Sequence, residues 1–249
     1  MPEALFHVHW GNYTSDLWHA LLKTLEFTAV GFAGAAVLGL LVALMRLSRV
    51  WPVRAVAVVY TELFKNVPLI AIILLVYNGL TQVGVVLGIF QAGAISLIVF
   101  YAAYLSEIFR AALLGVHFGQ KEAAEALGLS RWHTFAYVSF PQALRLALPG
   151  TNTMFVDLLK STSLLVVIGA GELMTQAQLI SSTTFRAFEV YMVIALVYFA
   201  MCFPLSQALL WFERQVQGGI ALLPSRRRRL RSARELLDAQ TTTGSEVLA

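Results

Sequence analysis

Long apolar stretches with few charged residues alternate along the chain with short charged segments. These stretches run from Phe27 to Met45, from Asn66 to Ser106, from Leu146 to Ala170 and from Val190 to Phe212. A transmembrane helix needs ~20 mostly apolar residues to cross the hydrocarbon core. The second stretch is about two spans long, and Gly and Gln collect between Asn78 and Gly93, where we expect a turn. The pattern therefore predicts an all-α polytopic membrane protein with five transmembrane helices.

Composition supports the same class. Of the 249 residues, 58% are hydrophobic and 13% are charged, whereas soluble domains have ~45–50% apolar and ~25% charged residues. These values exclude a disordered chain, a collagen-like fibre and a soluble globular domain. Cys202 is the one cysteine, so the chain has no internal disulfide. The segment from Met1 to Asp16 lacks the basic cap of a signal peptide, so we expect no cleavable leader.

Basic residues are concentrated after the first, third and fifth predicted spans, and the other two loops hold almost none. Cytoplasmic loops carry the excess of Lys and Arg, so we expect the N-terminus outside and the C-terminus in the cytoplasm. The basic run from Arg226 to Arg229 either anchors this topology or contacts anionic membrane lipid. The basic residues of the three loops are Arg46, Arg49 and Arg54; Arg110, Lys121, Arg131 and Arg145; and Arg214, Arg226 to Arg229, Arg231 and Arg234.

The long loop between the third and fourth spans has its own helical pattern. Strong helix formers run from Lys121 to Leu127, and Gly128 suits the left-handed residue that ends a helix. Ser130 is a good N-cap for a second helix that would end near Val138. Pro141 suits the first turn of the next element. The loop is therefore predicted to form two short helices with a tight corner.

Three interpretations of this loop compete. A bare connector would not need such well-capped helices. A DNA-binding helix-turn-helix fits the Ala-Glu-Ala-Leu-Gly-Leu-Ser pattern, but the second helix carries Trp132, Phe135 and Tyr137 and is tethered between two spans. We therefore favour a docking element for a cytoplasmic partner, with no nucleic acid involved.

The loop carries a family motif. Glu122-Ala123-Ala124, followed by Gly128 and Pro141, resembles the EAA loop of ABC importer permeases. Motifs on either side resemble the polar amino acid uptake branch of that family, with small departures at Lys65 and Phe140. These motifs are Glu62-Leu-Phe-Lys-Asn-Val-Pro-Leu69, Tyr104-Leu-Ser-Glu-Ile-Phe-Arg110, Gly119-Gln120, Phe140-Pro-Gln-Ala-Leu-Arg145, Leu159-Lys-Ser-Thr-Ser-Leu164, Ile168-Gly-Ala-Gly-Glu-Leu173 and Phe185-Arg-Ala-Phe-Glu-Val-Tyr191.

The resemblance covers roughly Thr24 to Arg214 and implies three regions. Residues 1–23 would form an extracytoplasmic N-terminal segment. Residues 24–214 would form an ABC transporter type-1 transmembrane domain, with the coupling loop at about 117–141, and residues 215–249 would form a basic cytoplasmic tail.

The same resemblance implies a permease subunit of an ATP-driven importer for polar amino acids, in the bacterial cytoplasmic (inner) membrane. Its partners would be two ATPase subunits, a second permease (the same or a related chain) and an extracytoplasmic solute-binding protein. The chain lacks the Gly-x-x-x-x-Gly-Lys-[Ser/Thr] phosphate loop, so ATP and magnesium belong on the partner ATPase; this chain is not an enzyme and binds no cofactor. The residues expected to couple to the ATPase are Glu122, Ala123, Ala124, Glu125, Gly128 and Arg131.

Two ionisable residues interrupt the fourth span. Charge at mid-membrane costs at least ~2.5–3.5 kcal/mol and so suggests a functional role. Asp157 and Lys160 share a helix face, where they could bind the ammonium and carboxylate of an amino acid or could pair with each other; both alternatives stay open. The substrate-pathway candidates are Asn66, Asn152, Asp157, Lys160, Ser161 and Thr162.

Two further acid–base pairs have the same three-residue spacing. Glu62 with Lys65 and Glu107 with Arg110 lie near predicted cytoplasmic ends, which favours gate or packing pairs. Asn66 precedes a Val-Pro dipeptide and predicts a broken helix of the kind that lines transport sites.

Two other function classes explain less of the sequence. An ATP-independent secondary transporter or channel would explain the spans but not the capped helix pair. A membrane-bound metalloenzyme would need clustered ligands, but the five histidines, His7, His9, His19, His117 and His133, do not converge at metal-ligand spacing, so no metal site is expected.

Overall fold

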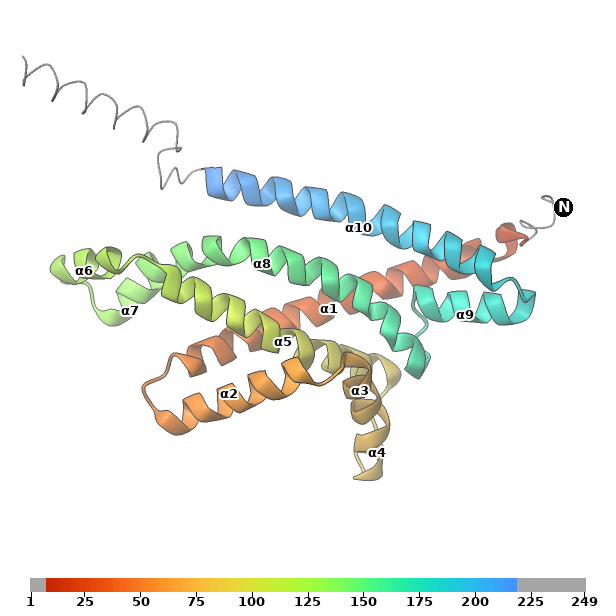
Figure 1. Ribbon diagram of the computed structural model, residues 1–249, viewed down its shortest axis with the longest axis horizontal. Helices are drawn as coiled ribbons and strands as arrows, with labels where there is room; N and C mark the ends of the chain where they lie inside the picture. Colours follow the sequence, from red (N-terminus) through yellow and green to blue (C-terminus); the bar gives the residue numbers. More distant parts are fainter. Residues whose placement is uncertain (1–7, 219–249) are drawn as a thin grey trace, which may run out of the picture. The chain divides into compact units, whose positions relative to one another are not determined.

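The computed structural model describes residues 8–218, and helices dominate this part of the chain (Figure 1). Four of its helices are long and apolar enough to cross a membrane: α1 (Thr14–Arg46), α5 (Ile89–Gly115), the run Arg131–Ile168 and the run Ala187–Val216 within α10 (Ala187–Gly218). A bent helix pair brings the number to five if it counts as one span. The predicted all-α polytopic membrane fold is confirmed.

The bent pair lies where the sequence predicts a broken helix. α2 (Trp51–Asn66) stops before Val67, and the run Leu69–Gln82, which begins with α3 (Leu69–Leu74), leaves at 107° to it (Figure 1). A proline forces the preceding residue into an extended conformation and has no N–H for the helical ladder; accordingly Val67 has φ −99° and ψ 131°. The chain continues through a π-helical turn, η2 (Leu75–Gly79), and the short α4 (Leu80–Gln82) before α5 begins.

Two predicted span boundaries are wrong. α1 begins at Thr14 rather than near Phe27, inside the segment 1–23 that we expected to precede the membrane domain. α2 begins at Trp51 rather than at Asn66. At both places the additional helical turns contain charged residues, so they lie outside the uncharged stretches from which the spans are predicted. Helices continue through charged residues wherever backbone hydrogen bonding is maintained.

The most extensive helix packing in the bundle joins α1 to α5. A Cβ atom added at Gly39 would lie 2.9 Å from Leu105 Cβ and 3.1 Å from the carbonyl oxygen of Ala102. Small residues at helix interfaces allow backbones to approach this closely in membranes. The many Gly and Ala residues of the first span therefore allow α1 and α5 to pack closely.

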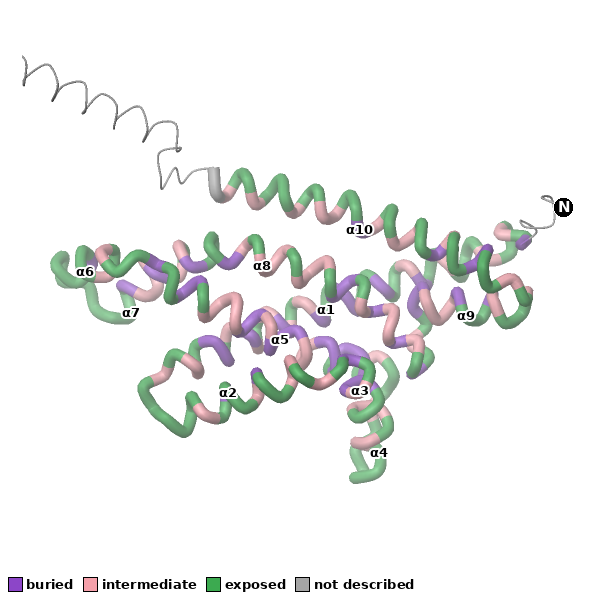
Figure 2. The backbone as a smooth tube through the Cα atoms, viewed as in Figure 1, coloured by how far each residue is buried: buried purple, intermediate pink, exposed green. Residues whose placement is uncertain are grey.

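Three groups of buried side chains hold the described helices together. The largest joins α1, α5, α8 (Phe140–Ser161) and the 3-10 helix η4 (Thr162–Ile168) around Phe27, Leu97, Tyr101 and Leu158. The second joins α9 (Leu173–Thr184) to α1 and α10, near the short 3-10 helix η1 (Trp10–Asn12). The third joins the end of α5 to the start of α8. Figure 2 shows buried positions where α1, α5 and α8 meet and exposed positions on their outer faces. The exposed apolar faces suit contact with lipid.

The long loop folds differently from the prediction in one respect. α6 (Phe118–Ala126) and α7 (Arg131–His133) form the expected corner, but the second helix does not end near Val138. It continues through the π-helical turn η3 (Thr134–Ser139) into α8 as one run. Pro141 therefore does not begin a separate element, as the sequence predicted, but lies inside this continuous run directly after the π-helical turn, where it donates no backbone hydrogen bond.

The chain divides into two compact units, residues 1–210 and residues 211–249. Of the second unit, residues 211–218 are described and form the end of α10. Pro204 lies inside α10. His7, the basic run Arg226–Arg229 and most of the predicted tail 215–249 lie outside the described residues.

Candidate functional site

The corner between α6 and α7 is fixed by a cap at each turn. His117 begins α6, and its Nδ1 accepts a hydrogen bond of 3.2 Å from the Gly119 N–H. Gly128 follows α6 with φ +77°, a left-handed conformation that side chains disfavour. The Ser130 hydroxyl then accepts from the His133 N–H at 3.4 Å to begin α7. The predictions that Gly128 ends one helix and that Ser130 caps the next are confirmed, so both turns of the corner are capped.

The surface of this corner is unusually apolar for a segment rich in charge. Leu127 is 82% exposed and Trp132 is 70% exposed, and Phe118 and Tyr137 are also largely exposed. Groups of exposed large apolar side chains mark interaction sites. The six predicted coupling residues lie among them: Glu122, Ala123, Glu125, Gly128 and Arg131 are exposed, and Ala124 is buried.

The buried side of α6 joins the corner to the membrane helices. Ala124 is 3% exposed, and α6 packs on η3. The Gln142 Nε2 donates to Gln120 Oε1 at 3.3 Å and so connects α6 to the first turns of α8. A force on the exposed face of α6 would therefore reach α8 through a short path.

The two acid–base pairs near the ends of α2 and α5 form one network. Glu107 Oε1 lies 2.6 Å from Arg46 Nη1 and 3.2 Å from Lys65 Nζ, and its other oxygen lies 3.1 Å from Arg110 Nη2. Lys65 also lies 3.4 Å from Glu62. The structure thus brings Glu62, Lys65, Glu107 and Arg110 together and adds Arg46. Partly buried charges need such partners because their desolvation is costly. The network ties α1, α2 and α5 together at one end of the bundle.

A second polar cluster lies inside the membrane helices. The Tyr101 hydroxyl on α5 lies 2.8 Å from Asp157 Oδ2 and 2.7 Å from Ser161 Oγ on α8. Tyr101 is buried, whereas Asp157 is exposed. Tyr101 is not among the residues predicted from the sequence, because a tyrosine inside an apolar span gives no signal until its partner helix is known.

Lys160 does not pair with Asp157: the ion pairs between described residues include neither side chain. Lys160 is exposed and lines a cavity of about 350 Å³ together with Ser163, Tyr191 and Tyr198. Of the two alternatives for Asp157 and Lys160, a mutual ion pair or contact with a substrate, the ion pair is absent from this structure. Both charged groups therefore remain able to contact a ligand.

The remaining pathway candidates are not gathered at this cluster. Asn66 Nδ2 donates to the Glu62 carbonyl at 2.7 Å, within the last turn of α2. Asn152 Nδ2 donates to the Leu209 carbonyl on α10 at 3.4 Å. Thr162 is buried, and its hydroxyl donates to the Leu159 carbonyl at 2.8 Å. Of the six, the structure brings Asp157 and Ser161 to a common partner.

Glu172 is a fully buried carboxyl group between η4 and α9. It accepts hydrogen bonds from the N–H groups of Met174 at 2.8 Å and Thr175 at 2.7 Å, and from the hydroxyls of Thr175 at 2.9 Å and Tyr198 at 3.0 Å. Burial raises the pKa of Glu172, and these donated hydrogen bonds oppose the rise. The residue caps α9 and connects it to α10.

Among residues 8–218, no three His, Cys, Asp or Glu side chains come together as a metal ion would require. The polar features of this part of the chain are the capped corner, the charge network and the Tyr101–Asp157–Ser161 cluster. Together they describe a helical membrane bundle with polar groups inside it and a capped, apolar corner at one end.

Comparison with known proteins gives the family. Residues 35–218 match the family described as "Binding-protein-dependent transport system inner membrane component", and the chain belongs to this family. It is therefore a membrane-spanning permease of the ABC transporter class.

Relatives share most of their length with this chain. It is 34% identical over 217 residues to the "Probable glutamine ABC transporter permease protein GlnM" of Bacillus subtilis (strain 168), covering 87% of this chain and 99% of the relative. It is 37% identical over 196 residues to the "Glutamine transport system permease protein GlnP" of Escherichia coli (strain K12), covering 78% and 90%. The solved structure described as "Crystal structure of an amino acid ABC transporter with histidines" has a TM-score of 0.78 and 37% identity, covering 84% of this chain and all of that chain.

Proposed function

We propose that the chain is the permease subunit of an ATP-driven importer for polar amino acids and forms half of the translocation pathway. Both relatives, from Bacillus subtilis and Escherichia coli, are glutamine permeases by name, and the similar solved structure is described as an amino acid transporter. Asp157 and Lys160, which form no ion pair within residues 8–218, support the same substrate class, because a zwitterion needs one acceptor and one cationic donor.

The observation that carries this proposal is the capped, apolar corner between α6 and α7. Its capped ends and its exposed Leu127 and Trp132 suit insertion into a groove on a partner protein. We infer that this partner is the ATPase, which binds ATP and magnesium and hydrolyses the nucleotide, while this chain binds no cofactor. Glu122, Ala123, Ala124, Glu125, Gly128 and Arg131 are the proposed coupling residues.

The assembly that follows has two such ATPase subunits, a second permease (the same or a related chain) and an extracytoplasmic solute-binding protein that delivers the substrate. The chain lies in the bacterial cytoplasmic (inner) membrane with its N-terminus outside and its C-terminus in the cytoplasm. The basic residues that follow α1 and α5 support this orientation.

Within the pathway, Asp157 accepts from the substrate ammonium and Lys160 donates to its carboxylate. The Tyr101 hydroxyl lies 2.8 Å from Asp157 and orients the Asp157 carboxylate. Asn66, Asn152, Ser161 and Thr162 complete the proposed pathway set. The network of Glu62, Lys65, Glu107 and Arg110 acts as a gate or packing contact, because a rocking motion of α2 against α5 would have to break it.

Reconstitution into vesicles tests the proposal. The chain is purified with its co-expressed partner subunits and supplied with solute-binding protein, and uptake of radiolabelled glutamine, histidine and arginine is measured with ATP inside the vesicles. We expect uptake that requires both ATP and the solute-binding protein. Equal uptake without ATP would instead identify a secondary transporter or channel.

A further inference from the structure

A cavity lies between the coupling corner and the membrane bundle; of its lining residues, Glu125 and Arg131 belong to the proposed coupling set and the others have no role in the proposed function. Its volume is about 490 Å³, and the turn after α1, the end of α5, α6, α7 and η3 form its walls. The side chains that give it a distinct chemistry are Arg49, Lys121, Glu125, Arg131 and Thr134.

The charges around this cavity are unbalanced. Arg49, Lys121 and Arg131 are cationic, and Glu125 is the single acid in the lining. Within residues 8–218, none of the three cations forms an ion pair. Three cations contributed by three segments repel one another unless an anion lies between them. The cavity therefore favours an anionic ligand.

Thr134 supplies a second, independent sign of a ligand. The residue is 6% exposed and lines the cavity, yet its Oγ1 has no hydrogen-bond partner among the described residues. Buried hydroxyl groups are almost always hydrogen-bonded. The Oγ1 atom itself has almost no accessible surface, so a rotation of the Thr134 side chain would be needed to bring this hydroxyl to a ligand oxygen beside the three cations.

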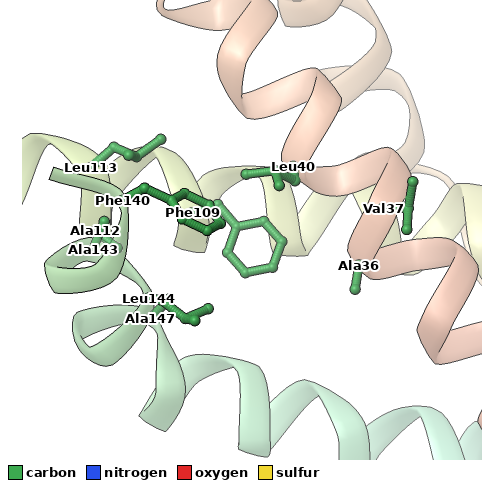
Figure 3. A pocket seen from close by; sticks show the side chains of 10 residues that line it. All are labelled: Ala36, Val37, Leu40, Phe109, Ala112, Leu113, Phe140, Ala143, Leu144 and Ala147. Carbon is green, nitrogen blue, oxygen red and sulfur yellow. The ribbon is translucent and has the colours of Figure 1, made fainter. Parts of the chain in front are cut away.

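An apolar crevice shares one lining residue, Leu113, with the cavity. The crevice has a volume of about 240 Å³ and lies between α1, α5 and α8, in the stretches able to span the membrane. Figure 3 shows the rings of Phe109 and Phe140 with Leu113, Leu40 and Ala36 along its walls. All of its lining side chains are apolar, so it suits a hydrocarbon chain.

We propose that the two spaces together bind one anionic membrane phospholipid. Its phosphate lies among Arg49, Lys121, Arg131 and the Thr134 hydroxyl, and one acyl chain occupies the crevice. A free phosphate or a soluble phosphate ester would occupy the cavity alone and leave the apolar crevice unfilled. The bound lipid would join the α1–α2 turn to α6 and α7, and so brace the coupling corner against the bundle.

Lipid retention by the purified transporter tests this proposal independently of transport. Delipidated transporter in detergent is titrated with dioleoylphosphatidylglycerol, and the bound lipid is counted by native mass spectrometry; dioleoylphosphatidylcholine and inorganic phosphate are the comparison ligands. We expect one phosphatidylglycerol per permease chain, with clearly weaker binding of phosphatidylcholine. Arg49→Gln and Lys121→Gln should each weaken binding about fivefold, and Thr134→Val roughly tenfold.

Matched variants separate this site from general surface charge. Arg54→Gln removes an exposed cation on α2 outside the cavity and should leave retention unchanged. Ala36→Leu fills the crevice and should weaken retention, while Ala33→Leu, on an exposed position of the same helix, should not. Each variant is first required to elute as a monodisperse complex.

Three results would overturn the proposal. Equal affinity for phosphatidylglycerol and phosphatidylcholine would show that the charge of the lipid does not determine binding. Equal losses in Arg54→Gln and Arg49→Gln would show nonspecific attraction. Binding of inorganic phosphate as tight as that of the lipid, unaffected by Ala36→Leu, would assign the cavity to a soluble anion.

Discussion

Asp157 and Lys160 lie three residues apart on α8 but form no ion pair with each other. Their three-residue spacing allows a mutual ion pair, but the structure directs Asp157 toward the Tyr101 hydroxyl on another helix. Sequence spacing indicates which residues share a helix face. It does not indicate which side chains of the neighbouring helix contact that face. For the same reason, the sequence indicates the Glu107–Arg110 pair but not the approach of Arg46 from α1.

Replacing Asp157 tests its proposed role. Asp157→Asn keeps an acceptor for Tyr101 but removes the charge, so the fold should be preserved. Loss of a charge-assisted hydrogen bond to the substrate ammonium should lower kcat/KM for ATP-dependent uptake roughly tenfold or more. The measurement is uptake of the radiolabelled amino acid into vesicles.

The matched control is Asp16→Asn, the same change at an exposed position in the first turn of α1. It should leave uptake as in the unmodified chain. If Asp157→Asn leaves uptake and selectivity unaltered, the Asp157 carboxylate does not contact the substrate in the pathway.

Glu172 gives a prediction about pH. Burial raises its pKa above the ordinary value of 4.5, so the folded chain binds this proton more tightly than the unfolded chain does. The protonated group therefore stabilises the fold fully below about pH 4.5, and this contribution is lost as pH rises through the raised pKa. The stability advantage of the unmodified chain over Glu172→Gln should shrink as pH rises.

Thermal unfolding of both proteins in the same detergent, from about pH 4.5 to about pH 8, measures this difference. An advantage that grows with pH would mean that the four donated hydrogen bonds keep the carboxylate ionised and that its pKa is lowered rather than raised.

At the scale of single elements, local rules predict the helix ends best. Pro68 breaks the second span and Gly128 ends α6, because both effects depend on backbone chemistry alone. The continuation of α7 through η3 into α8 could not be predicted in this way. It depends on a π-helical turn, which has no simple sequence signal.

Gly128→Ala tests whether the corner must be rigid. At φ +77° a Cβ atom costs about 1–2 kcal/mol, which should distort the link between α6 and α7. We expect substrate-stimulated ATP hydrolysis by the assembled transporter to fall severalfold while the permease still inserts and assembles. Gly115→Ala is the control, since its added Cβ would make an ordinary 3.5 Å contact with Leu146. Full coupling in Gly128→Ala would mean that the corner tolerates a different geometry.

At the scale of the whole molecule, the charge pattern predicts orientation in the membrane. Cys202→Ser first removes the one native cysteine, and single cysteines are then placed at Glu122 in α6 and at Val86 before α5. Both positions are exposed. A membrane-impermeant thiol reagent added to intact cells should label Val86→Cys and not Glu122→Cys. The reverse labelling pattern would invert the topology and place the coupling corner outside the cell.

We infer that the corner formed by α6 and α7 receives force from an ATPase. Crosslinking tests this inference with a photoreactive amino acid at Leu127, which is 82% exposed, and in a control chain at Val86, which is 79% exposed. After irradiation of native membranes, we expect a crosslink from position 127 to the ATP-hydrolysing subunit and none from position 86. If position 127 gives no crosslink in an actively transporting complex, or position 86 gives one, the corner does not contact the ATPase as inferred.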